Sequence, residues 1–391
     1  MGEVALIFMA FKKIKVALVF GTRPEAIKMA PIVKVLEKDF TRITPIVIVT
    51  AQHRHMLDQI LRIFRIKADY DLNIMAHNQT LADIVSTAVV RIDRVLAKEK
   101  PHLILVQGDT TTSFVAALAA YFHKIPIGHV EAGLRTYHKY EPFPEEINRR
   151  LTGVLTDLHF APTKTSYNHL MREGVDKKNI FVIGNTVIDA LLMIVKKDFD
   201  FHKIKSKTLA GKLSKIDFRK RRVILVTAHR RESFGKPFLN ICGAIRNIVE
   251  KNHDVEVIYP VHLNPNVQKP VNRILGGLDR VCLIPPLDYE IFTQLMSRCY
   301  LILTDSGGVQ EEAPSLGKPV LVMRNVTERP EAVKAGTVRL VGTDKRVIIR
   351  EVQRLLDNKK AYQVMSRSHN PYGDGRAAKR IHSLILRHFS N

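Results

Sequence analysis

The chain has 391 residues, 46% of them hydrophobic and 25% charged, which is ordinary for a globular protein but too long for one compact core. Its three cysteines match no metal motif and indicate free thiols in a reducing compartment, and its apolar runs stay short of the roughly 20 residues that a membrane span needs. The net charge of 61 − 38 = +23 attracts anions, but the basic residues are scattered and lack interleaved aromatics, which argues against nucleic-acid binding.

The first half of the chain alternates short apolar runs with segments of helical period. The apolar residues 4–11 follow Glu3 and precede no cleavage pattern, so they are interpreted as an extension before the first strand, with Met9 as a possible start. The strand–helix–strand rhythm predicts a parallel sheet with helices on both faces. The expected strands are 14–20, 43–50, 102–107 and 125–130, with helices from Pro24 and over 111–123.

The second half repeats this rhythm, with expected strands at 223–227, 256–259, 281–284, 301–304, 319–323 and 337–341. The lysine-rich segment 196–220 is taken as the region of the domain junction or as an exposed helical insertion. We expect an α/β fold of two Rossmann-like domains whose strand ends face a central cleft. The domains are 1–184 and 185–375, and an amphipathic last helix, about 376–391, packs back on the first.

The best-marked site is the segment 305–308, Asp-Ser-Gly-Gly, between a strand and a helix. The backbone N–H groups of Gly307 and Gly308, the hydroxyl of Ser306 and the positive end of the helix dipole are suited to an anion. Glu312 follows one turn later, where a carboxylate reaches a ribose diol. A tight turn between strand and helix is the simpler alternative.

A second anion-binding candidate is Gly-Thr-Arg-Pro-Glu-Ala-Ile-Lys at 21–28. Arg23 and Lys28 stand near one helix start and suit a diphosphate, unless Arg23 merely pairs with Glu25 on the surface. Neither the dinucleotide fingerprint Gly-x-Gly-x-x-Gly nor a Walker loop occurs in the chain, which argues against a nicotinamide, flavin or P-loop site.

Carboxylates at strand ends are the candidates for acid–base chemistry. Asp109 and Glu131 each follow an expected strand, and Glu145 lies in a Pro-Glu-Glu segment. Taken singly, each is more often a helix cap or an ion-pair partner. His229, after the first strand of the second half, suits phosphate binding or proton donation to a leaving group. The histidine spacing fits no metal motif, so no metal is expected.

Together these segments resemble the non-hydrolysing UDP-N-acetylglucosamine 2-epimerases from about residue 14 to the end. The motifs include Gly-Thr-Arg-Pro-Glu-Ala-Ile-Lys at 21–28, Gly-Asp-Thr-Thr-Thr at 108–112 and His-Val-Glu-Ala-Gly-Leu-Arg-Thr at 129–136. Further matching segments are 51–54, 184–190, 229–233, 262–267 and 305–337.

The resemblance implies a fold like the two-domain GT-B glycosyltransferases and the interconversion of UDP-GlcNAc and UDP-ManNAc without a cofactor. Anti elimination of UDP gives 2-acetamidoglucal, and UDP then adds back with C2 inverted. The resemblance further implies a cytoplasmic homodimer that supplies ManNAc for cell-surface polysaccharides, without nucleic-acid or membrane partners.

Site residues are carried over position by position. Arg23, His229, Ser306 and Gly307 would hold the diphosphate and Glu312 the ribose, while Phe292 would flank the uracil. Lys28 and Arg329 would contact phosphate or sugar, and Asp109, Glu131 and Glu145 would be the acid–base groups, with the C2 base left open. Gln52, His53 and Arg54 resemble the segment where a second UDP-GlcNAc binds. The chain departs from the family pattern at two positions. Leu287 stands where some relatives have glutamine, and Phe143 stands where others have tryptophan.

Four other functions stay open from sequence. A hydrolysing relative would release free ManNAc and UDP, and a glycosyltransferase of the same fold would transfer the sugar to an acceptor. A non-catalytic sugar-nucleotide sensor and a nucleic-acid-binding protein are the alternatives from other classes. The retained carboxylates argue against the sensor, and Glu131, Glu145 and the segment 327–331 argue against the glycosyltransferase. The hydrolysing relative shares the elimination step and differs only in its products.

Overall fold

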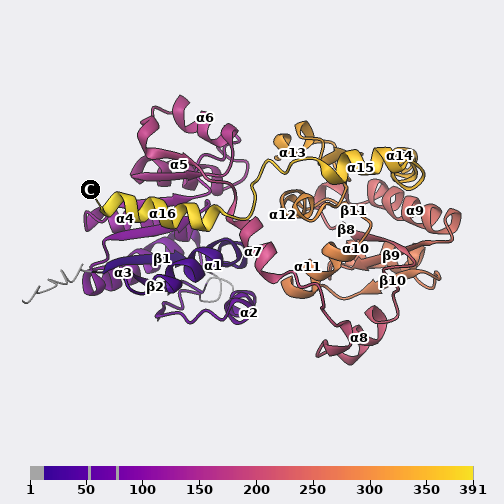
Figure 1. The fold of residues 1–391 in the computed structure, drawn as a ribbon, viewed down its shortest axis with the longest axis horizontal. Helices are drawn as coiled ribbons and strands as arrows, with labels where there is room; N and C mark the ends of the chain where they lie inside the picture. Colours follow the sequence, from indigo (N-terminus) through magenta and orange to yellow (C-terminus); the bar gives the residue numbers. More distant parts are fainter. Residues whose placement is uncertain (1–12, 52–53, 76–78, 391) are drawn as a thin grey trace, which may run out of the picture. The chain divides into compact units, whose positions relative to one another are not determined.

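The computed structural model describes residues 13–51, 54–75 and 79–390, which form two compact α/β units (Figure 1). The first unit extends to Ala190 and includes the segment from Gly375 onward, and the second unit comprises Leu191–Asp374. The division lies within helix α7 (Thr186–Ile194), whereas the sequence placed it after residue 184.

The first unit is built on a sheet of seven parallel strands in the order β3-β2-β1-β4-β5-β6-β7. Its strands are β1 (Ile14–Phe20), β2 (Ile43–Val49), β3 (Tyr70–Asp71), β4 (Leu103–Gln107), β5 (Ile127–Val130), β6 (Leu158–Ala161) and β7 (Ile180–Val182). Its helices before α7 are α1 (Arg23–Lys38), α2 (Arg54–Phe64), α3 (Leu81–Glu99), α4 (Thr111–Phe122), α5 (Glu145–Leu155) and α6 (Lys164–Arg172).

The second unit has six parallel strands in the order β10-β9-β8-β11-β12-β13. They are β8 (Arg222–Thr227), β9 (Val255–Pro260), β10 (Val281–Ile284), β11 (Leu301–Thr304), β12 (Val320–Val322) and β13 (Val338–Leu340). The helices are α8 (Lys207–Leu213), α9 (Lys236–Lys251), α10 (Pro265–Leu275), α11 (Tyr289–Arg298), α12 (Gly307–Glu312), α13 (Pro330–Lys334), α14 (Lys345–Asp357) and α15 (Lys359–Arg367).

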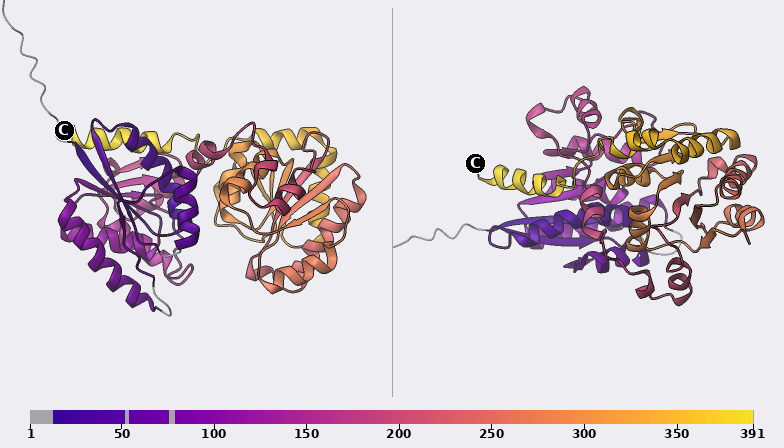
Figure 2. Two further views of the ribbon diagram at one scale, coloured as in Figure 1. Left: turned by 90° about the horizontal axis from the view of Figure 1, so that it is seen from below. Right: turned by 45° about the vertical axis from the view of Figure 1, so that its right-hand side comes forward.

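Helices cover both faces of each sheet (Figure 2), which explains why the central strands are apolar along their whole length. Every residue of β4 and β11 is buried. The expected strands are therefore found within a few residues of their predicted bounds. The short strands β3, β6 and β7 were not anticipated, and the lysine-rich segment 196–220 carries helix α8 within the second unit.

Both sheets reverse their winding direction at one place, between β1 and β4 in the first unit and between β8 and β11 in the second. The carboxyl ends of such neighbouring strands are where open α/β sheets bind ligands. The segments after β4 and β11, which resemble each other in sequence, occupy equivalent positions in the two topologies. The segments that begin at Gly21, Gly108, Ala228 and Asp305 follow the four strands that flank these reversal points, and Glu131 follows the next strand, β5.

The last helix, α16 (Ala377–Phe389), returns to the first unit and packs against α1 (Figure 1). Asp189 of α7 accepts hydrogen bonds from the backbone N–H groups of Ala377 (3.2 Å) and Ala378 (2.9 Å), at the start of the helix. His382 lies 2.7 Å from the Asp39 carboxylate at the end of α1. Across the three described ranges, no helix is long and apolar enough to cross a membrane.

Candidate active site

The loop between β11 and α12 is fixed by a buried carboxylate. Asp305 Oδ2 accepts hydrogen bonds from the backbone N–H groups of His229 (2.6 Å) and Arg230 (2.7 Å). Asp305 therefore joins the loop after β11 to the loop after β8. The hydroxyl of Ser306, the residue before α12, makes no capping hydrogen bond to the helix. The loop thus holds its backbone in place and leaves a hydroxyl at the positive end of the helix dipole.

His229 lies on the loop after β8, which Asp305 joins to the loop that carries Ser306. Its ring lies parallel to that of His262, with centroids 5.4 Å apart, and its Nδ1 is 3.4 Å from Asp305 Oδ1. Burial lowers the pKa of His229 below its usual value, and His262 and Arg230 lower it further, whereas Asp305 opposes the shift. A neutral ring beside a bound anion retains one N–H that can donate a hydrogen bond.

Arg329 lies beside the start of α12. A Cβ at Gly307 would stand 3.8 Å from the guanidinium. Arg329 forms an ion pair with the buried Glu311 and lies 3.7 Å from the carboxylate of Glu328. Ser306, Gly307 and Arg329, chosen separately from the sequence, are therefore close together in the second unit.

Glu312 ends α12 and is buried, with Oε2 accepting a 2.9 Å hydrogen bond from the hydroxyl of Tyr289. Burial and the adjacent carboxylate raise the pKa of Tyr289 well above its usual value, so its hydroxyl stays a donor. Phe292, the expected neighbour of uracil, is half-buried one turn further along α11. This arrangement fixes the orientation of the Glu312 carboxylate.

In the first unit, Glu131 is a buried carboxylate whose oxygens accept hydrogen bonds from the side chains of Lys28, Gln107 and Asn185. Lys28 Nζ of α1 lies 2.5 and 2.7 Å from its two oxygens, Gln107 Nε2 lies 2.5 Å from Oε2, and Asn185 Nδ2 lies 3.0 Å from Oε1. Its backbone is left-handed, with φ of 66°. Such a conformation costs energy in a non-glycine residue and recurs at functional sites.

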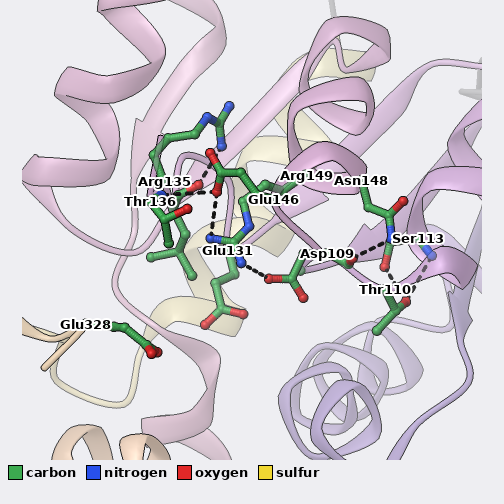
Figure 3. A network of polar contacts seen from close by, with 12 residues as sticks. Asp109, Thr110, Ser113, Glu131, Arg135, Thr136, Glu146, Asn148, Arg149 and Glu328 are labelled. Carbon is green, nitrogen blue, oxygen red and sulfur yellow. Dashed lines mark hydrogen bonds and ion pairs between the residues drawn. The ribbon is translucent and has the colours of Figure 1, made fainter. Parts of the chain in front are cut away.

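Asp109 follows β4 by one glycine and is held by α5 (Figure 3). Arg149 Nη2 lies 2.6 Å from Asp109 Oδ2, and Asn148 Nδ2 donates to the Asp109 carbonyl at 3.1 Å. Unlike Glu131, Asp109 keeps 28% of its side chain exposed. Burial raises the pKa of Asp109; the charges of Glu131 and Glu145 add to this shift, and Arg149 and Lys28 oppose it.

The remaining predicted residues of the first unit have different surroundings. Glu145 is half-buried at the first position of α5, and Arg23 is exposed at the first position of α1. Arg54, at the start of α2, lies 3.1 Å from the Asp71 carboxylate and donates to Asn73 at 3.1 Å. Gln52 and His53, expected beside it, lie outside the described residues.

The sequence allows Glu25 to be a surface partner of Arg23, but the structure shows Glu25 almost fully buried. Its carboxylate accepts hydrogen bonds from the N–H groups of Gly21 (3.1 Å) and Thr22 (2.8 Å). It also accepts from the hydroxyls of Thr110 (2.7 Å) and Ser113 (3.2 Å). Glu25 thus joins the loop after β1 to the loop after β4, and the surface ion pair is not formed.

Three residues that contact the candidate catalytic carboxylates were not expected from the sequence, namely Gln107, Asn185 and Arg149. Gln107 is the polar last residue of the otherwise apolar strand β4, and this break in pattern was a usable signal. Arg149 lies on the buried side of α5, where an unpaired charge would be costly. The position of Asn185 before α7 gave no such signal.

Comparison with known proteins assigns a family. The family model described as UDP-N-acetylglucosamine 2-epimerase matches residues 36–386. The UDP-N-acetylglucosamine 2-epimerase of Escherichia coli K12 is 57% identical over 367 residues, which is 94% of this chain and 97% of that protein. Similarity therefore extends over both units.

Solved structures agree with this. A crystal structure described as a UDP-N-acetylglucosamine 2-epimerase from Listeria monocytogenes is 51% identical, with a TM-score of 0.90 and 97% coverage of both chains. The UDP-GlcNAc 2-epimerase of Neisseria meningitidis, solved bound to UDP-GlcNAc, is 50% identical, with a TM-score of 0.82, and covers 96% of this chain and 100% of that one. The two parallel sheets thus correspond to the GT-B-like fold of these proteins.

Proposed function

The chain belongs to the UDP-N-acetylglucosamine 2-epimerase family, and from this premise we propose that it interconverts UDP-GlcNAc and UDP-ManNAc by elimination and re-addition of UDP. A base takes the C2 proton of the sugar while the C1–O bond breaks and its electron pair goes to UDP. The carbon–carbon double bond of 2-acetamidoglucal forms between C1 and C2. A proton then reaches the opposite face of C2, and UDP adds back to C1.

We propose Asp109 as the group that removes the C2 proton. A general base needs a reachable lone pair and a pKa nearer to neutrality than that of a free carboxyl group. Asp109 is partly exposed, and burial raises its pKa. Glu131 is buried and its oxygens already accept hydrogen bonds from Lys28, Gln107 and Asn185, so we assign it the role of positioning Lys28 near the sugar. Glu145, half-buried and close enough to influence Asp109, is the candidate proton donor on return.

The second unit is proposed to hold UDP. Ser306, the N–H groups at the start of α12, His229 and Arg329 supply donors and positive charge for the diphosphate. Glu312, oriented by Tyr289, accepts from the ribose hydroxyls, and Phe292 lies against the uracil. On the family resemblance, Arg23, exposed at the start of α1, is proposed as a further cation for a diphosphate. These contacts retain UDP after the C1–O bond has broken.

The observation that carries the proposal is the partly exposed Asp109 carboxylate, which is bonded to Arg149 and lies near the ion pair of Lys28 with Glu131; burial, which raises the pKa of Asp109, supports it. Incubating the purified protein with UDP-GlcNAc in D2O tests it. We expect UDP-ManNAc to form with deuterium at C2, observed by proton NMR and mass spectrometry. Product without deuterium, or no exchange at C2, would contradict the mechanism. Stoichiometric release of UDP and free ManNAc would identify a hydrolysing enzyme instead.

Three further features are proposed on the family resemblance. The protein acts as a homodimer in the cytoplasm, and its product supplies ManNAc units for cell-surface polysaccharides. The segment that contains Gln52, His53 and Arg54 takes a second UDP-GlcNAc as activator. A sigmoidal dependence of the rate on UDP-GlcNAc, abolished by substitution of Arg54, is the expected sign of that activator site.

A further inference from the structure

Helix α5 contacts the Asp109 turn through two consecutive residues. Asn148 donates to the Asp109 carbonyl at 3.1 Å, and Arg149 donates to its carboxylate at 2.6 Å. The backbone and the side chain of Asp109 are therefore both bonded to one rigid element. A guanidinium that donates to a carboxylate restricts its rotation more strongly than a neutral donor does.

Arg149 has a second carboxylate partner one turn earlier on its own helix. Glu146 Oε2 lies 3.4 Å from Arg149 Nη1, and the Glu146 side chain is fully buried. Glu146 also accepts hydrogen bonds from the backbone N–H groups of Thr136 (3.0 Å) and Tyr137 (3.2 Å), in the loop that follows β5 (Figure 3). The guanidinium is thus fixed from behind by a carboxylate that is itself anchored to the backbone.

We propose that Arg149 is a positioning residue that holds the Asp109 carboxylate ionised and in one orientation for removal of the C2 proton, with Glu146 fixing the guanidinium. This inference rests on the function proposed above. Arg149 is 10% exposed, and its buried Nε has no hydrogen-bond partner among the described residues, so its polar contacts are concentrated on the two carboxylates. A residue placed only for stability would be expected to satisfy that donor as well.

The charges around Asp109 set the expected direction of the effect. Burial and the neighbouring carboxylates disfavour the ionised form of Asp109, and Arg149 is the strongest of the opposing influences on its pKa. Removing the charge of Arg149 should therefore raise the pKa of Asp109 further. The groups that face this carboxylate are Lys28 from α1, Glu131 after β5, and Glu145 and Arg149 from α5, with Glu146 behind Arg149 and the neutral His129 bonded to the Gly108 carbonyl.

The test compares the pH profiles of kcat/KM for the full-length wild type, Arg149→Gln and Arg149→Lys. A base must be ionised to act, so a higher pKa moves the acidic limb of the profile to higher pH. We expect the acidic limb to move up by about one pH unit in Arg149→Gln. At pH values on the acidic limb, kcat/KM should therefore be about ten-fold lower than in the wild type. Arg149→Lys keeps the charge, so its limb should stay close to that of the wild type while its kcat falls because one ammonium cannot bridge both carboxylates.

Arg150→Gln is the matched control, because Arg150 is the exposed neighbour on α5 and the charge change is the same. An equal limb shift in this variant, or a loss of activity in Arg149→Gln that is uniform with pH, would overturn the inference. If Arg149→Gln does not fold, Arg149→Lys decides. If Arg149→Lys has the acidic limb of the wild type and a lowered kcat, the proposal is supported. If its acidic limb moves to higher pH by a full unit, the proposal is refuted. C2 exchange by the wild type in D2O is measured first, so failure of the proposed function is recognised separately.

Discussion

At the scale of single residues, the two carboxylates after β4 and β5 lie in opposite surroundings. Glu131 has its oxygens bonded to Lys28, Gln107 and Asn185, whereas Asp109 has one charged donor and remains partly exposed. The sequence ranks the two alike, because each simply follows an apolar strand. Only the donors that come from elsewhere in the chain distinguish the enclosed Glu131 carboxylate from the partly exposed Asp109 carboxylate.

This difference predicts that Asp109→Asn separates activity from stability. We expect the rate of C2 exchange to fall at least about 100-fold, because the proposed proton acceptor is lost. A raised pKa means that Asp109 is harder to ionise in the folded protein than in the unfolded chain. Its ionisation therefore lowers the free energy of unfolding as the pH rises through its folded pKa. The variant should match the wild type at low pH and become relatively more stable as the pH rises.

Urea unfolding of both proteins at a series of pH values measures this difference. Asp58→Asn on α2 serves as control, since 48% of the Asp58 side chain is exposed. The difference in free energy of unfolding between Asp58→Asn and the wild type should not increase with pH as it does for Asp109→Asn. Retention of C2 exchange by Asp109→Asn would exclude Asp109 as the base, whatever the stability result.

At the scale of elements, α1 is held at its start by a carboxylate that also bonds the beginning of α4. Glu25 accepts from Gly21 and Thr22 at one end and from Thr110 and Ser113 at the other. This links the loops that carry Arg23 and Asp109. The sequence motif contains Glu25 but does not show whether its side chain points into the protein or to the surface, because the same spacing also suits a surface ion pair with Arg23.

We expect Glu25→Ala to lower the free energy of unfolding by about 2–4 kcal/mol, because a helix cap is lost and buried backbone donors are left without acceptors. Glu37→Ala, at an exposed position of the same helix, should change it by less than about 0.5 kcal/mol. Hydrogen exchange read by mass spectrometry should show faster exchange in peptides around both Gly21 and Thr110. Faster exchange in the α1 peptide alone would indicate that the hydrogen bonds from Thr110 and Ser113 to Glu25 do not contribute to stability.

At the scale of the whole molecule, the sequence was most informative about the sheets and least informative about side-chain partners. Strands such as β4 and β11 are continuous apolar runs, and that pattern defines both their bounds and their burial. The pairing of Asp109 with Arg149 depends instead on α5 packing near the end of β4, forty residues away. Ser306 and Arg329 similarly become neighbours only through folding of the second unit.

The return of α16 to the first unit makes the stability of that unit depend on the end of the chain. Ile381 of α16 is fully buried, and Ser383 is exposed on the same helix. We expect Ile381→Ala to lower the free energy of unfolding by about 2–5 kcal/mol, the usual cost of truncating a buried aliphatic side chain. Ser383→Ala should stay within about 0.5 kcal/mol of the wild type.

The location of the effect is the sharper part of this prediction. Ile381 follows the whole second unit in sequence but packs in the first, through a helix that Asp189 caps. In hydrogen-exchange mass spectrometry, Ile381→Ala should accelerate exchange in peptides of α1 and β1 and leave those of β8 and β11 unchanged. Equal acceleration in both units would mean that they unfold as one cooperative body, in which case a substitution in α16 would destabilise the loop between β11 and α12 as much as the Asp109 turn.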